Sequence, residues 1–151
     1  TEAKGEGAAA LARLRQMSPP RMSDHASRDL FRALARASEG AGDDAAALKW
    51  YGAFVEFDSQ ARQCRGCHAT EGPREMSFYR DWYAGRKFGE YAKSTGEAPR
   101  LIATHEATLV HEPNNLAAQL TLAYLYEARG EDAKAQALWA RIDPAPPRLT
   151  R

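Results

Sequence analysis

The sequence predicts an all-α fold built from about three helical hairpins, and three observations lead to this prediction. Ala, Leu, Arg, Glu and Lys dominate the 151 residues, while the alternating pattern of β-strands is nearly absent, so more than half of the chain is expected to be helical. Gly96 and Gly130 lie 34 residues apart, and each stands between two amphipathic segments. Gly42 stands in the same kind of frame, which gives a third hairpin.

The frame around Gly130 is the clearest of the three. Its large and small apolar residues recur at helical spacing, and the unit closes at Pro147. Such residues let two helices pack together, and each pair then buries its remaining apolar edge against the next pair. The residues concerned are Ala118, Leu122, Ala123 and Tyr126 before the turn, and Ala135, Trp139 and Ile142 after it. This pattern resembles the tetratricopeptide repeat.

The other two frames follow the same pattern with departures. Around Gly96, Phe88-Gly89 is the large-small pair, Leu101 stands where the repeat usually has a small residue, and His105 takes the aromatic position before Pro113. The residues of the frame around Gly42 are Phe31, Leu34 and Ala35 before the turn, and Ala47, Tyr51 and Phe54 after it. An irregular helical bundle is the alternative to true repeats.

The expected organisation is a single all-helical domain over residues 1–151. The first and second repeats are separated by about twenty residues more than uninterrupted repeats would be, so a segment is inserted there. The predicted parts are an N-terminal helix or arm (1–22), repeat 1 (23–60), an insert (61–81), repeat 2 (82–113) and repeat 3 (114–147). The resemblance to tetratricopeptide proteins implies a groove for a partner, lined here by Tyr83, Arg86, Glu90, Leu120, Tyr124 and Glu127.

The insert contains both cysteines of the chain, in Cys64-Arg65-Gly66-Cys67-His68. Cys-x-x-Cys-His is the attachment pattern of c-type haem: the thiols form thioethers to the two vinyl groups, and the imidazole binds the iron from the proximal side. The alternatives are a dithiol redox motif, which needs a thioredoxin-like βαβ context, and half of a zinc site, which needs two more ligands at suitable spacing. Neither context is visible, so we expect one covalent haem c and call residues 61–81 the haem-binding insert.

The second axial position of the iron has several candidate ligands, and the sequence leaves the choice open. His105 should point inward because Tyr51 and Trp139 take its position in the sister repeats, although it could instead be a hydrogen-bonded core histidine. Met76 is eight residues past His68, a stretch that extends to roughly 26 Å. His25 follows a probable helix start. Further candidates are His111, Met22 and Met17.

Residues 64–68 resemble the haem site of c-type cytochromes, and this resemblance implies an electron carrier rather than an enzyme. The carrier would dock through its repeats onto a redox protein or other cytochrome subunits. Haem attachment implies a periplasmic or otherwise extracytoplasmic location, with the export signal absent from a mature or trimmed chain. The alternatives are a haem enzyme or gas-binding protein with an open sixth position, and a haem-free repeat scaffold or assembly factor.

The sequence argues against nucleic-acid binding and against a transmembrane segment. The net charge of +1 argues against a nucleic-acid-binding protein. No apolar run approaches the roughly 18–20 residues that a membrane-spanning helix needs, so no transmembrane segment is expected.

Overall fold

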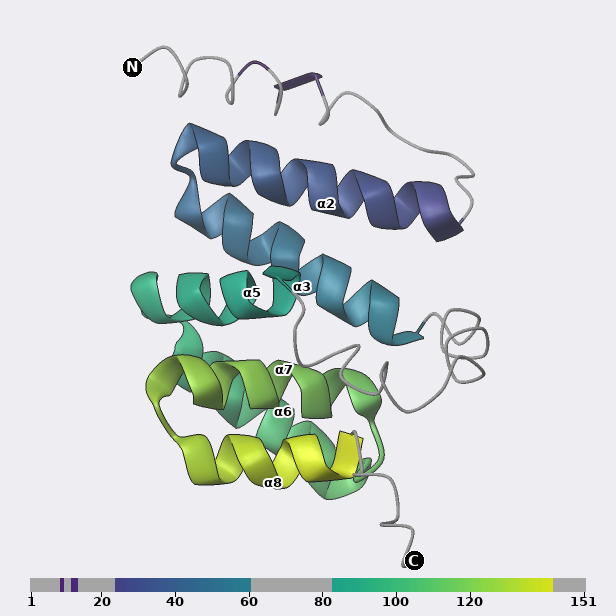
Figure 1. The fold of residues 1–151 in the computed structure, drawn as a ribbon, viewed down its shortest axis with the longest axis vertical. Helices are drawn as coiled ribbons and strands as arrows, with labels where there is room; N and C mark the ends of the chain where they lie inside the picture. Colours follow the sequence, from purple (N-terminus) through teal and green to yellow (C-terminus); the bar gives the residue numbers. More distant parts are fainter. Residues whose placement is uncertain (1–8, 10–11, 14–23, 61–82, 143–151) are drawn as a thin grey trace, which may run out of the picture.

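The computed structural model describes residues 9, 12–13, 24–60 and 83–142, and the side chains of 24–28 and 57–60 are not described (Figure 1). Within these ranges the chain forms helices and no β-strand, so the predicted all-α fold is confirmed there. None of these helices is long and apolar enough to cross a lipid bilayer. The main helices are α2 (Asp24–Ala41), α3 (Asp44–Gln60), α5 (Tyr83–Ser94), α6 (Ala98–His111), α7 (Leu116–Arg129) and α8 (Asp132–Ile142).

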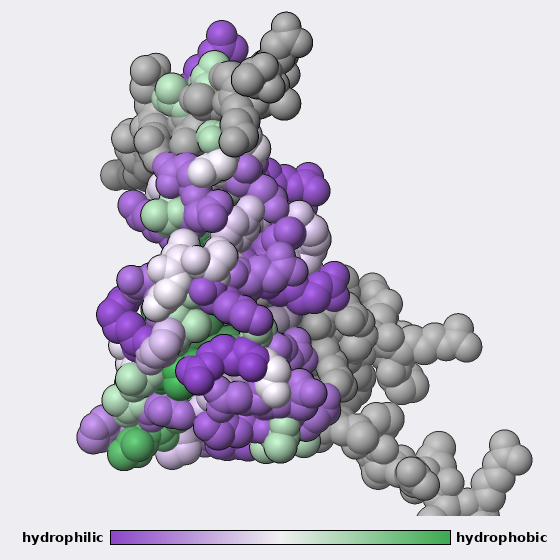
Figure 2. Space-filling model, turned by 90° about the vertical axis from the view of Figure 1, so that its left-hand side faces the viewer, coloured by the Kyte–Doolittle hydropathy of each residue, from purple (hydrophilic) through white to green (hydrophobic). Residues whose placement is uncertain are grey.

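The helices form three antiparallel pairs, α2–α3, α5–α6 and α7–α8, whose turns lie at the same end of the molecule (Figure 1). Gly42, Gly96 and Gly130 occupy these turns with φ angles of 72°, 76° and 73°. This left-handed conformation ends a helix, and glycine adopts it without a Cβ penalty. The surface on this side is mostly hydrophilic, with a few apolar residues in its lower half (Figure 2).

Local chemistry also sets where the helices begin. Asp43 Oδ1 accepts a hydrogen bond from the Ala46 amide at 2.9 Å at the start of α3, and Asn115 Oδ1 accepts one from the Ala118 amide at 3.0 Å at the start of α7. These contacts satisfy amides that have no partner within the helix. Helix α6 has proline in its first turn instead, where the missing amide hydrogen costs nothing.

Equivalent positions of the three pairs fill the core. Each helix before a turn carries a large buried residue eight positions before the turn glycine and a small one immediately after it. The large residues are Leu34, Phe88 and Leu122, and the small residues that follow them are Ala35, Gly89 and Ala123, respectively. The repeat-like packing inferred from the sequence is therefore present in all three pairs.

The turn glycines also locate the extra residues between the first and second pairs. Gly42 and Gly96 are 54 residues apart, against 34 for Gly96 and Gly130. The excess of twenty residues falls between Gln60, where α3 ends, and Tyr83, where α5 begins. The haem-binding insert predicted for this interval lies outside the described residues, as does most of the predicted N-terminal arm.

The groove predicted from the repeat resemblance is wrong for two of its residues. Leu120 and Tyr124 are buried, with 0% and 1% of their surface exposed, because α5 and α8 cover these parts of α7. Close approach of α5 is possible because Gly85 faces the Tyr124 ring and Gly89 faces the Tyr124 carbonyl. These two side chains therefore belong to the core rather than to a binding surface.

The second pair is more open than the other two. Helix α6 packs chiefly against α7 and makes few contacts with α5, its own partner in the hairpin, whereas α2 and α3, and α7 and α8, pack closely. Five residues after the turn glycine, the close pairs have Ala47 and Ala135, which are buried, and the open pair has the half-buried Leu101. A larger side chain at this position requires more room between the helices. Leu101, which departs from the small residue of the repeat, thus lies in the pair whose helices are further apart.

Candidate functional site

The predicted site residues divide into two groups. Cys64, Cys67, His68 and Met76 lie outside the described residues. The side chain of His25 lies outside them as well, although its backbone is in the first turn of α2. Of the candidate second axial ligands, His105 and His111 have described side chains. His105 lies half-buried on α6, and His111 is exposed at the end of the same helix.

His105 lines a cavity of about 1240 Å³ that the open second pair leaves beside α3. Its volume exceeds the range of roughly 300–1,000 Å³ that is common for small-molecule sites. Residues of α3, α6 and the beginning of α7 form most of its wall. The apolar part of the wall includes Leu48, Ala53, Phe88, Leu101 and Leu116, and the charged part includes Lys49, Glu56, Glu97 and Arg100.

The equivalent aromatic residues in the sister pairs are held by hydrogen bonds. The Tyr51 hydroxyl donates to Glu39 Oε2 at 2.8 Å, and Trp139 Nε1 donates to Glu127 Oε1 at 2.6 Å. In both pairs the aromatic residue stands nine positions after the turn glycine and the glutamate three positions before it. In the pairs α2–α3 and α7–α8, this aromatic side chain is therefore held by a hydrogen bond between the two helices.

The second pair lacks this arrangement. Lys93, which is exposed, stands where the sister pairs have glutamate, and its ammonium group offers no acceptor to His105. Within the ranges 24–60 and 83–142, no hydrogen bond joins the His105 imidazole to another residue. Among the described residues, the His105 ring thus lines the cavity without the hydrogen bond that holds the equivalent ring in each sister pair.

Burial determines the charge state of His105. Desolvation lowers the pKa of the imidazole below its ordinary value, and the negative charge of Glu56 opposes this effect only in part. The ring is therefore neutral at pH 7, and one of its nitrogens carries a free lone pair. Neutral imidazole is the form that binds metals.

His105 does not belong to a metal site made by the described side chains alone. In the part of the chain that the structure describes, no group of three or more His, Cys, Asp or Glu residues is placed to hold an ion. A single histidine can instead complete the coordination of a metal that other atoms already hold, as an axial ligand does in haem proteins. This is the chemistry that the His105 cavity can offer.

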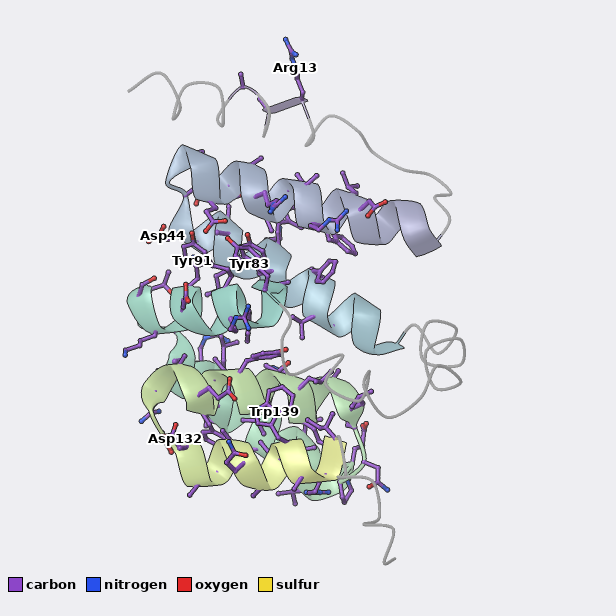
Figure 3. The ribbon with its side chains drawn as sticks, in the orientation of Figure 1. Arg13, Asp44, Tyr83, Tyr91, Asp132 and Trp139 are labelled. Atoms are coloured by element: carbon purple, nitrogen blue, oxygen red, sulfur yellow. The ribbon has the colours of Figure 1, made fainter. Side chains whose placement is uncertain are left out.

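A second group of polar residues, not predicted from the sequence, joins the first pair to α5. We call it the Glu39 cluster: the hydroxyls of Tyr51, Tyr91 and Tyr83 donate to the Glu39 carboxylate at 2.8, 3.1 and 3.4 Å, and Lys87 Nζ lies 3.3 Å from it. Figure 3 shows Tyr83 and Tyr91 between α5 and the first pair. The Tyr51 and Tyr91 rings are stacked at 6.0 Å. The cluster ties the start of the second pair to the first.

The Glu39 cluster perturbs the acidity of its members. Burial acts to raise the pKa of Glu39, but hydrogen bonds from Tyr51, Tyr91 and Lys87, together with the Lys87 charge, lower it overall. Burial, and then the hydrogen bond to Glu39, raise the pKa of Tyr91 to about 12. The same two causes raise the pKa of Tyr51. The native arrangement therefore keeps Glu39 ionised and Tyr51 and Tyr91 protonated.

Stability is expected to fall as the pH rises from about 10 to about 12. The unfolded chain releases a tyrosine proton near pH 10, whereas folded Tyr91 keeps its proton up to about pH 12. In this interval the folded state binds more protons, so the free energy of unfolding decreases with pH. Urea unfolding of the wild type and of Tyr91→Phe between pH 9 and pH 12 measures the effect. The variant should show the shallower decrease, and equal slopes would contradict this role of Tyr91.

Comparison with known proteins gives no match, since no family model, no curated protein and no solved structure is significantly similar to the chain. The chemistry that can be assigned comes from the chain itself: the Cys-x-x-Cys-His motif and the cavity that His105 lines.

Proposed function

We propose that the protein is a monohaem c-type cytochrome that transfers single electrons. The observation that carries the proposal is the motif Cys64-Arg65-Gly66-Cys67-His68 in an interval of the chain that lies between two helical pairs. Cys64 and Cys67 would hold the haem covalently, and His68 would bind the iron. Haem c supplies a reversible couple between ferric and ferrous iron.

The packing of the helical pairs supports a cofactor-bearing segment at this place. The core positions of the pairs before and after the interval correspond, so the stack continues across it. The described members of the Glu39 cluster, which lie on α2, α3 and α5, join α5 to the first pair.

The cavity lies within reach of the motif. Glu56 in its wall is one helical turn before Gln60, the last residue of α3. His68 follows Gln60 by eight residues, which span up to about 26–29 Å. The length of the chain therefore allows a haem attached at Cys64 and Cys67 to reach the cavity.

The cavity also suits the group that it would receive. A porphyrin needs a large apolar space, and Leu48, Phe88 and Leu101 contribute apolar walls to a volume of about 1240 Å³. Its propionates need positive charge, and the same wall contains the exposed cations Lys49 and Arg100, of which Arg100 is ion-paired with Glu97 at 2.6 Å. Both requirements of a haem, apolar for the ring and cationic for the carboxylates, are represented.

The proposal includes a setting for the electron transfer. Electron carriers act through partners, so we propose that the protein docks onto a redox protein or onto other cytochrome subunits. Since c-type haem is attached outside the cytoplasm, the proposed location is periplasmic or otherwise extracytoplasmic. Burial of the haem and its axial ligands would set the reduction potential.

The test is to produce the chain with export and haem-attachment machinery and to measure its intact mass and pyridine haemochrome spectrum. We expect a mass increased by one haem and colour that stays with the protein after acid-acetone extraction. The matched control is Cys64→Ala/Cys67→Ala, which should have the mass of the polypeptide alone and lose any colour on extraction. Exported wild-type protein without colour and with two unmodified thiols would overturn the proposal and leave the haem-free scaffold.

A further inference from the structure

The second helical pair differs from its two neighbours at three related positions. An imidazole, His105, replaces the aromatic residue; Lys93 replaces the glutamate that would hold it; and Leu101 replaces the small residue that lets the helices close. Each change in isolation would weaken the pair. Together they produce a cavity with an imidazole in its wall.

The His105 ring is not held in the way that the equivalent rings of the sister pairs are. A histidine that stabilises a core is hydrogen-bonded, because an unpaired buried polar group destabilises the folded state. The sister residues Tyr51 and Trp139 satisfy that rule through Glu39 and Glu127, whereas His105 has no hydrogen bond to any described residue. Among the described residues, no side chain holds the His105 ring, which lines the cavity.

We propose that His105 is the second axial ligand of the haem iron, on the side opposite His68. This role of His105 rests on the proposed function. The backbone of α6 is fixed by its packing against α7, so the imidazole is offered from a rigid element. The iron then has a histidine on each side, and both axial positions are filled by the protein. Such a site favours electron transfer over gas binding or oxygen chemistry, which need an open position.

The experiment compares haem-loaded wild type with His105→Ala and His111→Ala. His111 is the matched control because it lies on the same helix, six residues further on, and is exposed. We expect ferric wild type and His111→Ala to be low-spin by electron paramagnetic resonance, and their ferrous forms not to bind carbon monoxide. His105→Ala should lose the low-spin signal and bind carbon monoxide, and added imidazole should restore the low-spin signal.

A second substitution keeps the test decisive if His105→Ala folds poorly. His105→Met should retain a six-coordinate iron and gain the near-infrared absorption band of methionine–iron ligation. A histidine with a purely structural role would not produce this band. Circular dichroism and the pyridine haemochrome spectrum confirm that each variant is helical and carries one haem.

Two results would overturn the role of His105. One is a low-spin spectrum that is the same in His105→Ala as in wild type, with Met76→Leu or His25→Ala losing it instead. The other is wild-type protein that is high-spin and binds carbon monoxide before any substitution. Both results are obtained on protein with covalent haem, so they differ from failure of the proposed function, in which no haem is attached at all.

Discussion

Replacing Tyr124 by alanine is expected to lower the free energy of unfolding by about 3–5 kcal/mol, the range for removal of a fully buried aromatic ring. Tyr124 is 1% exposed, and its ring meets that of Trp139 edge to face, with centroids 5.1 Å apart. On its other side the ring lies against Gly85 of α5. Removal of the ring would leave a void where α5, α7 and α8 meet. Gly85, which faces the ring, has no side chain that could fill this void.

Equilibrium urea denaturation followed by circular dichroism measures this effect. Val110→Ala is the control, because Val110 is 76% exposed and truncation of exposed residues usually changes stability by less than about 0.5 kcal/mol. A loss below about 1 kcal/mol for Tyr124→Ala would mean that this ring does not occupy the described core position.

The substitution Gly85→Ala is expected to destabilise the protein by about 1–3 kcal/mol, although alanine is the better helix former. An added Cβ would lie 2.1 Å from two atoms of the Tyr124 ring, far closer than van der Waals contact. The ring cannot move away freely because Trp139 packs against it. Either α5 must move away from α7 or the ring must leave its position.

Gly40→Ala is the matched control for Gly85→Ala. Gly40 is also helical, in α2, but a Cβ there would meet nothing within 4 Å. This substitution should stabilise the protein by about 0.5–1 kcal/mol, because alanine restricts the unfolded chain without a clash. Opposite signs for two identical chemical changes would isolate the effect of the helix contact.

A double-mutant cycle identifies the atoms responsible. In the Tyr124→Ala background, Gly85→Ala should destabilise much less, or stabilise, since the ring that obstructs the Cβ is gone. An equal loss in both backgrounds would show that Gly85→Ala acts through something other than Tyr124.

The helical pairs could be predicted because their signals are local. A glycine that ends a helix can be recognised from a few neighbouring residues. Gly42, Gly96 and Gly130 adopt the left-handed conformation expected of such turns. The difference in spacing between these glycines also located the extra twenty residues. Neither inference needs knowledge of which helices touch.

The surfaces of the helices could not be predicted as well, because they depend on contacts between distant segments. Helix α7 is apolar on several sides, and the sequence does not tell which neighbour covers which side. Leu120 and Tyr124 were therefore assigned to a groove although they are buried. Gly85 and Gly89, four residues apart on α5, were the available signal of a close helix contact.

The sequence predicted individual residues of the candidate site, but it did not predict the cavity that they line. The register of the repeats placed His105 at an inward position, and Leu101 was visible as a departure from the small residue of the repeat. The cavity next to them depends on how α6 leans on α7, which no local pattern encodes. Attachment of haem at Cys64 and Cys67 and ligation by His68 remain predictions from the motif.

The Glu39 cluster has a consequence for how this protein can evolve. Because it fastens α5 to the first pair, Gln60 and Tyr83 are two anchored points, and the chain between them closes a loop. The entropy of closing a loop grows only logarithmically, by about 0.6 kcal/mol for each doubling of its length. By this term alone, a change in the length of the interval would cost little folding free energy.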